Sequence, residues 1–162
     1  MAGGILPVAR YKGQLFFLFG REVGDGKWSD FGGRREGDET PWETAIREGS
    51  EELNGFFGNT KDLGVLVNNN AVYRVHINSY DTYIFQIDYD ANLPNYFVNN
   101  HRFIKKHLPK EVRKGNGLFE KSEIAWFSLT ELRRSRHFFR NFYRKTIDTI
   151  RANSSVISSN MR

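Results

Sequence analysis

Apolar and aromatic positions dominate two neighbouring stretches near the start of the chain, residues 4–11 (GILPVARY) and 13–22 (GQLFFLFGRE). Both stretches are rich in the β-branched and aromatic residues that favour strands. Lys12-Gly13 is a turn signal, because glycine accepts the left-handed backbone of a tight turn. We therefore predict an antiparallel hairpin, followed by a short extended segment at residues 27–34 (KWSDFGGR).

Residues 41–53 carry the clearest helical pattern in the chain. Thr40 is suited to cap this helix, with Pro41 in its first turn and Glu43 placed to complete a capping box. Asn54-Gly55 supplies the left-handed stop that ends many helices. One stripe of the helix is apolar or small and should face a sheet: Trp42, Ala45, Ile46, Gly49 and Leu53.

Gly49 lies in the middle of that stripe, where a glycine costs a helix ~1 kcal/mol relative to alanine. A residue chosen against helix propensity indicates that the helix approaches the sheet closely at this point. The alternative is a glycine that is merely tolerated.

The remaining apolar segments interleave further strands with further helices. Strands are predicted at residues 62–67, 71–77, 81–89 and 123–129, and helices at about 97–107 and at 135–151. This order predicts an α/β fold whose mixed sheet carries helices on both faces. We expect a single domain over residues 1–151 with a basic insertion at about 91–119, and a disordered polar tail at residues 152–162.

Composition narrows the class of protein. The chain of 162 residues has 39% hydrophobic and 27% charged residues and no cysteine, so disulfide frameworks and thiol chemistry are excluded. We expect a cytoplasmic protein that does not bind membranes, because no apolar run approaches a membrane span and the first residues do not resemble a secretory leader. Oligomeric state is left open by the sequence.

Charge is divided unevenly along the chain. Residues 1–98 hold 9 Lys and Arg against 14 Asp and Glu, whereas residues 99–162 hold 15 against 5, so the formal charges are −5 and +10. A basic half beside an acidic site suits a polyanionic ligand that is bridged by metal. Solvated helices rich in Lys and Arg would give the same composition.

Three carboxylates crowd the end of the predicted helix. Glu51 and Glu52 follow Glu48 by three and four residues. All three therefore project beside the apolar stripe and repel one another. At this spacing they can converge on a hard divalent cation such as Mg²⁺. An acidic solvated helix face is the alternative, but it leaves the repulsion unanswered.

The spacing of these acids resembles the Nudix box of the Nudix hydrolases, G-x5-E-x7-R-E-U-x-E-E-x-G-U, with U bulky and apolar. It begins at Gly33, reaches Glu39 after five residues and then matches Arg47, Glu48, Glu51 and Glu52. The chain departs from the pattern at three positions: Gly49 stands at the first apolar position, Asn54 at the glycine and Gly55 at the last apolar position. These departures concern packing and the helix exit, and every charged position is intact. The resemblance implies an α/β/α sandwich and hydrolysis of a pyrophosphate bond in a nucleoside diphosphate linked to another group.

Roles carried over from this resemblance fall on individual residues. Glu48 and Glu52 would be the principal ligands of Mg²⁺ or Mn²⁺, and the Gly32 carbonyl would complete the coordination. Glu51 would add a ligand or position the attacking water. Two further residues would support them: Arg47 by ion pairing with the carboxylates, and Glu39 by holding the loop before the helix.

A general base outside the box is also expected, since members of the family often recruit a glutamate from a separate loop. Glu120, six residues before Trp126, is our candidate for the base and for a further metal ligand, and Glu123 is the second choice. A surface acid near the start of a strand is an equally good explanation for either residue.

Substrate choice is indicated only weakly. Tyr73 follows Gly55 by 18 residues, which resembles the subfamily acting on dinucleoside polyphosphates and diphosphoinositol polyphosphates. Cations interleaved with aromatic residues in the insertion combine phosphate contact with base stacking, as proteins that bind single-stranded nucleic acid do, so the 5′ end of a capped RNA is a third candidate: Lys105, Lys106, Arg113 and Lys114. A Nudix fold that binds a nucleotide or RNA without hydrolysing it is the alternative of another class.

Overall fold

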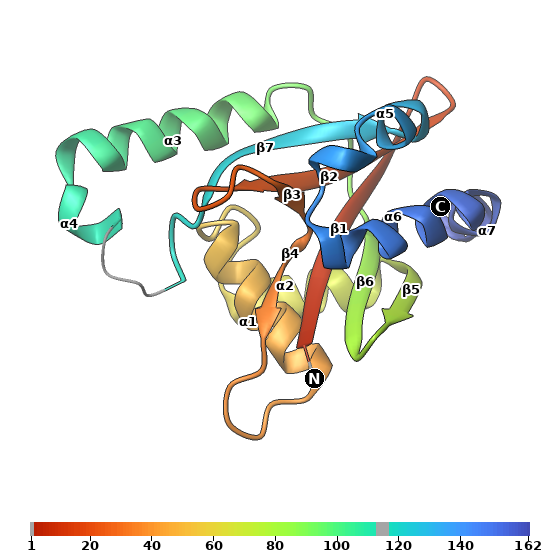
Figure 1. The fold of residues 1–162 in the computed structure, drawn as a ribbon, viewed down its shortest axis with the longest axis horizontal. Helices are drawn as coiled ribbons and strands as arrows, with labels where there is room; N and C mark the ends of the chain where they lie inside the picture. The colour runs from red at the N-terminus through yellow and green to blue at the C-terminus, as the bar shows by residue number, and fades with distance from the viewer. Residues whose placement is uncertain (1, 113–116) are drawn as a thin grey trace.

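The computed structural model describes residues 2–112 and 117–162, and within them a mixed sheet of seven strands forms the centre of the molecule (Figure 1). Strand β1 pairs in parallel with β6 and antiparallel with β2 and β4, while β7 pairs antiparallel with β2. The strands are β1 Ala2–Tyr11, β2 Gln14–Glu22, β3 Trp28–Ser29, β4 Phe31–Arg34, β5 Ala71–Ile77, β6 Tyr80–Gln86 and β7 Lys121–Ser128.

Helices cover both faces of this sheet. The α-helices are α1 Pro41–Glu52, α2 Thr60–Asn69, α3 Leu93–His107, α4 Pro109–Val112, α5 Leu129–Arg134, α6 Arg144–Ala152 and α7 Ser154–Asn160, and two 3₁₀ turns are η1 Arg136–Phe138 and η2 Asn141–Tyr143. Side chains of α1, α2 and α3 enter one hydrophobic core, and those of α5, α6 and α7 enter a second core on the other face. The predicted mixed sheet between two helical layers is confirmed.

Local signals placed the first hairpin and helix α1 correctly. Lys12 and Gly13 have φ of 49° and 76°, as the turn requires. The Thr40 hydroxyl accepts a hydrogen bond from the Glu43 amide at 3.2 Å, and the Glu43 carboxylate accepts one from the Thr40 amide at 2.7 Å. Asn54 follows the helix with φ of 51°, so the predicted capping box and stop are both present.

Two predicted elements are wrong. Residues 62–67 are part of helix α2 and not a strand, because Asn59 and Asp62 form a capping box and Leu63 and Val67, four residues apart, are buried. The predicted helix at 135–151 is broken, and only α6 is regular over Arg144–Ala152. It breaks because the Arg140 amide donates to the Trp28 carbonyl at 3.0 Å and ties this segment to β3.

The last residues are ordered, so the expected disordered tail at 152–162 is also wrong. Helix α7 occupies Ser154–Asn160, and its Ile157 is fully buried. The Arg162 amide donates to the Gln86 side chain at 2.8 Å. Ile157 and Met161, four residues apart, place two apolar side chains on one face and dock this otherwise polar segment.

Helix α1 lies unusually close to the sheet. A Cβ atom added at Gly49 would lie 2.5 Å from Cδ1 of Ile5, a fully buried residue of β1. The close approach predicted from Gly49 is therefore present. It brings the carboxylates at the end of α1 against β4, where Gly32 and Gly33 lie.

Candidate active site

A polar cavity of about 390 Å³ opens between the end of α1, strand β4, the end of β2 and the loop before β7. Six carboxylates line it, together with three arginines: Glu22, Glu36, Glu48, Glu51, Glu52 and Glu120, and Arg34, Arg47 and Arg140. Every acid that the sequence placed in a metal or catalytic role therefore lies at one cavity, except Glu39 and the second-choice base Glu123. The acidic pattern of α1 is not a plain solvated face.

Arg47 holds the carboxylates of α1 in place. Its guanidinium lies 3.1 Å from Glu48 and 3.2 Å from Glu51, and it donates to the Arg34 carbonyl at 3.1 Å. Burial raises the pKa of Glu48 and of Glu51, against the lowering effect of Arg47. The cation thus offsets repulsion between acids that are partly withdrawn from water.

Glu39 supports the loop before α1, as the resemblance implies. Its carboxylate accepts hydrogen bonds from Arg47 at 2.7 Å, from the Thr44 hydroxyl at 3.0 Å and from the Glu36 amide at 3.1 Å. The hydrogen bond from Arg47 is the main reason why the pKa of Glu39 falls to about 2. Glu39 lies outside the cavity and orients Arg47 from behind.

Glu52 lies at the base of the cavity and is almost fully buried, with 3% of its surface exposed. One carboxylate oxygen lies 3.2 Å from the Lys121 ammonium, and the other accepts a hydrogen bond from the Gly32 amide at 2.7 Å. Burial raises the pKa of Glu52 to about 8, against the lowering effect of Lys121. Both oxygens of this carboxylate therefore have protein partners.

Glycines bring the backbone up to the acids. A Cβ atom at Gly33 would lie 2.4 Å from the carboxyl group of Glu48, so only glycine leaves room for that side chain. On the opposite wall, a Cβ at Gly117 would lie 2.3 Å from Oε2 of Glu51. The loop that carries Glu120 is thereby held against α1.

A buried network supports β4 from behind. The Asp30 carboxylate, 1% exposed, accepts hydrogen bonds from the Tyr80 hydroxyl at 2.8 Å and the Thr82 hydroxyl at 3.0 Å. Burial raises the pKa of Asp30 to about 6. Tyr80 also packs directly on Gly32, where an added Cβ would lie 2.3 Å from its hydroxyl oxygen.

The donor set of the cavity fits a hard divalent cation, since it consists of carboxylate and carbonyl oxygens with open positions beside them. In the described parts of the chain, no three acidic or histidine side chains already converge as a ligand group. The carboxylates are instead turned toward Arg47 and Lys121. Four of the predicted ligands, Glu48, Glu51, Glu52 and Glu120, line this cavity and could supply oxygens to such an ion.

Of the other predicted site residues, only some lie at the cavity. Among the described residues that line the cavity, Glu120 is present, but Tyr73 and Glu123 are not. Tyr73 lies in β5 at the far edge of the sheet and packs on the opposite core, while Glu123 pairs with Arg21 at 3.1 Å. Lys105 and Lys106 are exposed in the last turn of α3. The predicted residues Arg113 and Lys114 lie outside the described residues.

Sequence reasoning missed Glu22, Lys121 and Arg140. Lys121 stands opposite Glu22 in the β2–β7 pairing, and Arg140 reaches Glu22 at 3.3 Å from the segment between the two 3₁₀ turns. Pairs this distant in the chain have no local signature. Finding Lys121 would have needed the register of β2 against β7, and finding Arg140 would have needed the contact of its segment with β3.

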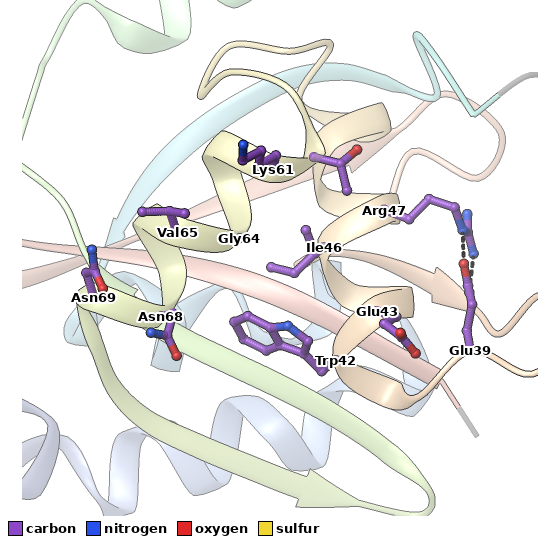
Figure 2. Close-up of a pocket in the computed structure, with 11 residues that line it drawn as sticks. Glu39, Trp42, Glu43, Ile46, Arg47, Lys61, Gly64, Val65, Asn68 and Asn69 are labelled. Carbon is purple, nitrogen blue, oxygen red and sulfur yellow. Dashed lines mark hydrogen bonds and ion pairs between the residues drawn. The ribbon is translucent and has the colours of Figure 1, made fainter.

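A larger groove of about 800 Å³ lies on the outer side of α1 and α2 (Figure 2). Trp42 and Ile46 of α1 face Lys61 and Val65 of α2 across it, and the Glu39–Arg47 pair marks its edge. It contains none of the three box carboxylates on the last turns of α1. Size therefore does not identify the reactive site here, and the smaller cavity is the candidate.

Comparisons with known proteins agree with this geometry. A family model of the NUDIX domain matches residues 2–150. A search of curated proteins finds no match. No helix among the described residues has the length and apolar character needed to cross a membrane.

Solved structures show the same fold at low identity. An Ap4A hydrolase from C. elegans, crystallised as a binary complex, has a TM-score of 0.59 and 13% identity over 98% of this chain and 99% of its own. A bifunctional NMN adenylyltransferase/ADP ribose pyrophosphatase from Francisella tularensis, complexed with AMP and a Mn ion, has a TM-score of 0.60 and 14% identity. That match covers 94% of this chain and 41% of the other chain. RenU, a Nudix hydrolase from M. smegmatis, has a TM-score of 0.53 and 15% identity over 96% of this chain and 86% of its own.

Proposed function

The chain belongs to the NUDIX domain family, whose members act on phosphoric anhydrides, and from this premise we propose that it is a metal-dependent pyrophosphohydrolase of a nucleoside diphosphate linked to another group. One observation supports this most strongly. Glu48, Glu51 and Glu120 from two separate segments line one cavity, and Arg47 holds the first two. Mg²⁺ or Mn²⁺ is the proposed cofactor, with the Gly32 carbonyl as a further ligand.

Four residues of the cavity have separate tasks in this proposal. A bound divalent ion would neutralise phosphate charge and lower the pKa of a water molecule. The Glu120 carboxylate would accept the proton of the attacking water, because it is exposed on the open wall of the cavity. Arg140 and Arg34 would contact phosphate oxygens, as guanidinium groups commonly do. Arg47 would keep the carboxylates ionised and oriented.

The preferred substrate is proposed from charge. Exposed Lys105 and Lys106 on α3 lie in the basic insertion, which favours a ligand with more phosphates than a simple sugar nucleotide. Capped RNA, dinucleoside polyphosphates and diphosphoinositol polyphosphates all meet that requirement. The exposed aromatic residues Tyr96 and Phe103 on the same helix favour RNA among them, because they can stack on bases.

The test is incubation with capped RNA, Ap4A, a diphosphoinositol polyphosphate and ADP-ribose in Mg²⁺, with products separated by chromatography. We expect cleavage at a pyrophosphate bond, and its loss with excess chelator while circular dichroism stays unchanged. Turnover that survives the chelator would refute the metal mechanism. Tight binding of a substrate without any product would instead support a non-catalytic nucleotide- or RNA-binding module.

A further inference from the structure

Lys121 is a buried cation that pairs with two carboxylates of the cavity, Glu22 and Glu52. It is fully buried at the start of β7, where it stands opposite Glu22 in the pairing with β2. Its stem fills the space over Gly20, where an added Cβ would lie 2.8 Å from Cδ of the lysine. Strands β7 and β2 and the missing side chain at Gly20 thus leave a space that the Lys121 side chain fills.

The ammonium group of Lys121 has three partners for its three donors. It pairs with the Glu22 carboxylate, lies 3.2 Å from Oε1 of Glu52 and donates to the Ser29 hydroxyl at 2.9 Å. Burial alone would lower the pKa of Lys121, but the adjacent Glu52 and Glu22 outweigh burial and raise it. Removing a buried ammonium whose donors are all paired would leave its carboxylate partners without a counter-ion.

Glu52 is consequently engaged on both sides. One oxygen faces Lys121 and the other accepts from the Gly32 amide at 2.7 Å. Glu48 and Glu51 differ, because both pair with Arg47, whose side chain is 19% exposed, and not with the fully buried Lys121. The box acids are therefore unequal in their freedom to bind an added ion.

We propose that Lys121 is a resident counter-ion that takes the place of one divalent cation between Glu22 and Glu52. Among the carboxylates, exchangeable metal then binds only to Glu48, Glu51 and Glu120, and Glu52 positions the Gly32 backbone rather than serving as a ligand. This inference rests on the proposed function. It departs from the ligand set that the Nudix resemblance implies, in which Glu52 is a principal ligand.

The number of bound ions tests the proposal without any assay of activity. Mn²⁺ is titrated into the protein and free Mn²⁺ is followed by electron paramagnetic resonance. Lys121→Met removes the charge and keeps an unbranched side chain. We expect this variant to bind one more Mn²⁺ per chain than the wild type, and to gain more thermal stability from Mn²⁺ than the wild type does. Lys145→Met, which changes an exposed lysine of α6, is the matched control.

Two glutamate variants keep the test decisive if Lys121→Met folds poorly. Glu52→Gln should retain the wild-type number of bound Mn²⁺, whereas Glu48→Gln should lose an ion. Loss of an ion in Glu52→Gln, or a folded Lys121→Met that binds no additional ion, would overturn the role of Lys121. A wild-type protein that binds no Mn²⁺ at all would overturn the proposed function together with this inference, so the two failures are distinguishable.

Discussion

Arg47 shows how one side chain sets the charge state of its neighbours. It contacts Glu39 behind the cavity and Glu48 and Glu51 in front of it. The pKa of Glu39 falls to about 2, mainly through its hydrogen bond with Arg47, while burial raises the pKa of both cavity acids. The guanidinium thus lowers the pKa of all three acids, and burial outweighs this effect only at the two cavity acids.

Glu39→Gln tests this effect through the pH dependence of stability. The pKa of Glu39 is lower in the folded state than its ordinary value of 4.5, so its stabilising effect is complete above that value and is lost as the pH falls toward 2. The variant should be less stable at pH 7, and its stability should fall less steeply across the acid window. Urea unfolding between pH 7 and 2.5 measures both. Asp38→Asn, which alters a fully exposed acid, should keep the wild-type slope.

Glu120 and Glu123 give a matched pair for the general base. Only Glu120 lines the cavity, whereas Glu123 pairs with Arg21. Loss of a general base lowers turnover by ~10²–10⁴-fold. We expect a reduction of that order in kcat for Glu120→Gln, with unchanged thermal unfolding, and little effect for Glu123→Gln. Steady-state kinetics on the best substrate decides the matter, and a larger effect at Glu123 would reverse the assignment.

Single residues also show how far sequence reasoning reaches. Glu48 and Glu51 were found because they share one helix and a fixed spacing, so their convergence follows from helical geometry. Lys121 was missed because in the chain it looks like any surface lysine. The register of β2 against β7 brings Glu22 to it, and the packing of α1 on the sheet brings Glu52.

Elements were predicted well where the local chemistry of a helix end or a turn is strong. The capping box at Thr40 and the stop at Asn54 placed α1, whereas the short apolar run of α2 was taken for a strand because a run of six residues fits either state. The Asn59–Asp62 box was the signal that would have corrected it. Long-range backbone hydrogen bonds that interrupt a helix, such as that from the Arg140 amide to the Trp28 carbonyl, have no such local sequence signal.

Gly49→Ala tests the packing of α1 on the sheet. Alanine should favour a helix by ~1 kcal/mol, but here its methyl group would meet the buried Ile5 at 2.5 Å. Overpacking of this kind costs ~1–3 kcal/mol, so we expect a net loss of stability in urea unfolding. Gly64→Ala in α2 is the control, because its methyl would lie 3.7 Å from Ile46 and should leave stability equal or higher. Equal gains in both variants would show that α1 does not approach the sheet so closely.

On the scale of the whole molecule, the fold places opposite charges on different parts. The box acids lie on α1 against β4, whereas exposed Lys105 and Lys106 end helix α3. Helix α3 packs beside β7, the strand that begins directly after Glu120 (Figure 1). Helix α3, which carries these lysines, covers the same face of the sheet as α1. A polyanion bound at the acidic cavity therefore has a cationic helix on the same side of the sheet.

The double charge reversal Lys105→Glu/Lys106→Glu asks whether that helix contacts a polymer. If both lysines bind phosphates of RNA, affinity for capped RNA should fall far more than affinity for a free dinucleotide, because a polymer releases condensed counter-ions at each contact. The slope of log affinity against log salt for single-stranded RNA should become shallower by ~0.7 for each contact removed. Turnover of the small substrate should change little, since the carboxylates and Arg47 are untouched.

Arg133→Glu/Lys145→Glu makes the same change of net charge on the α5–α6 face and should preserve the wild-type slope. Equal weakening in both double variants would mean that only net charge matters, and an unchanged slope in both would favour a small polyphosphate as the substrate.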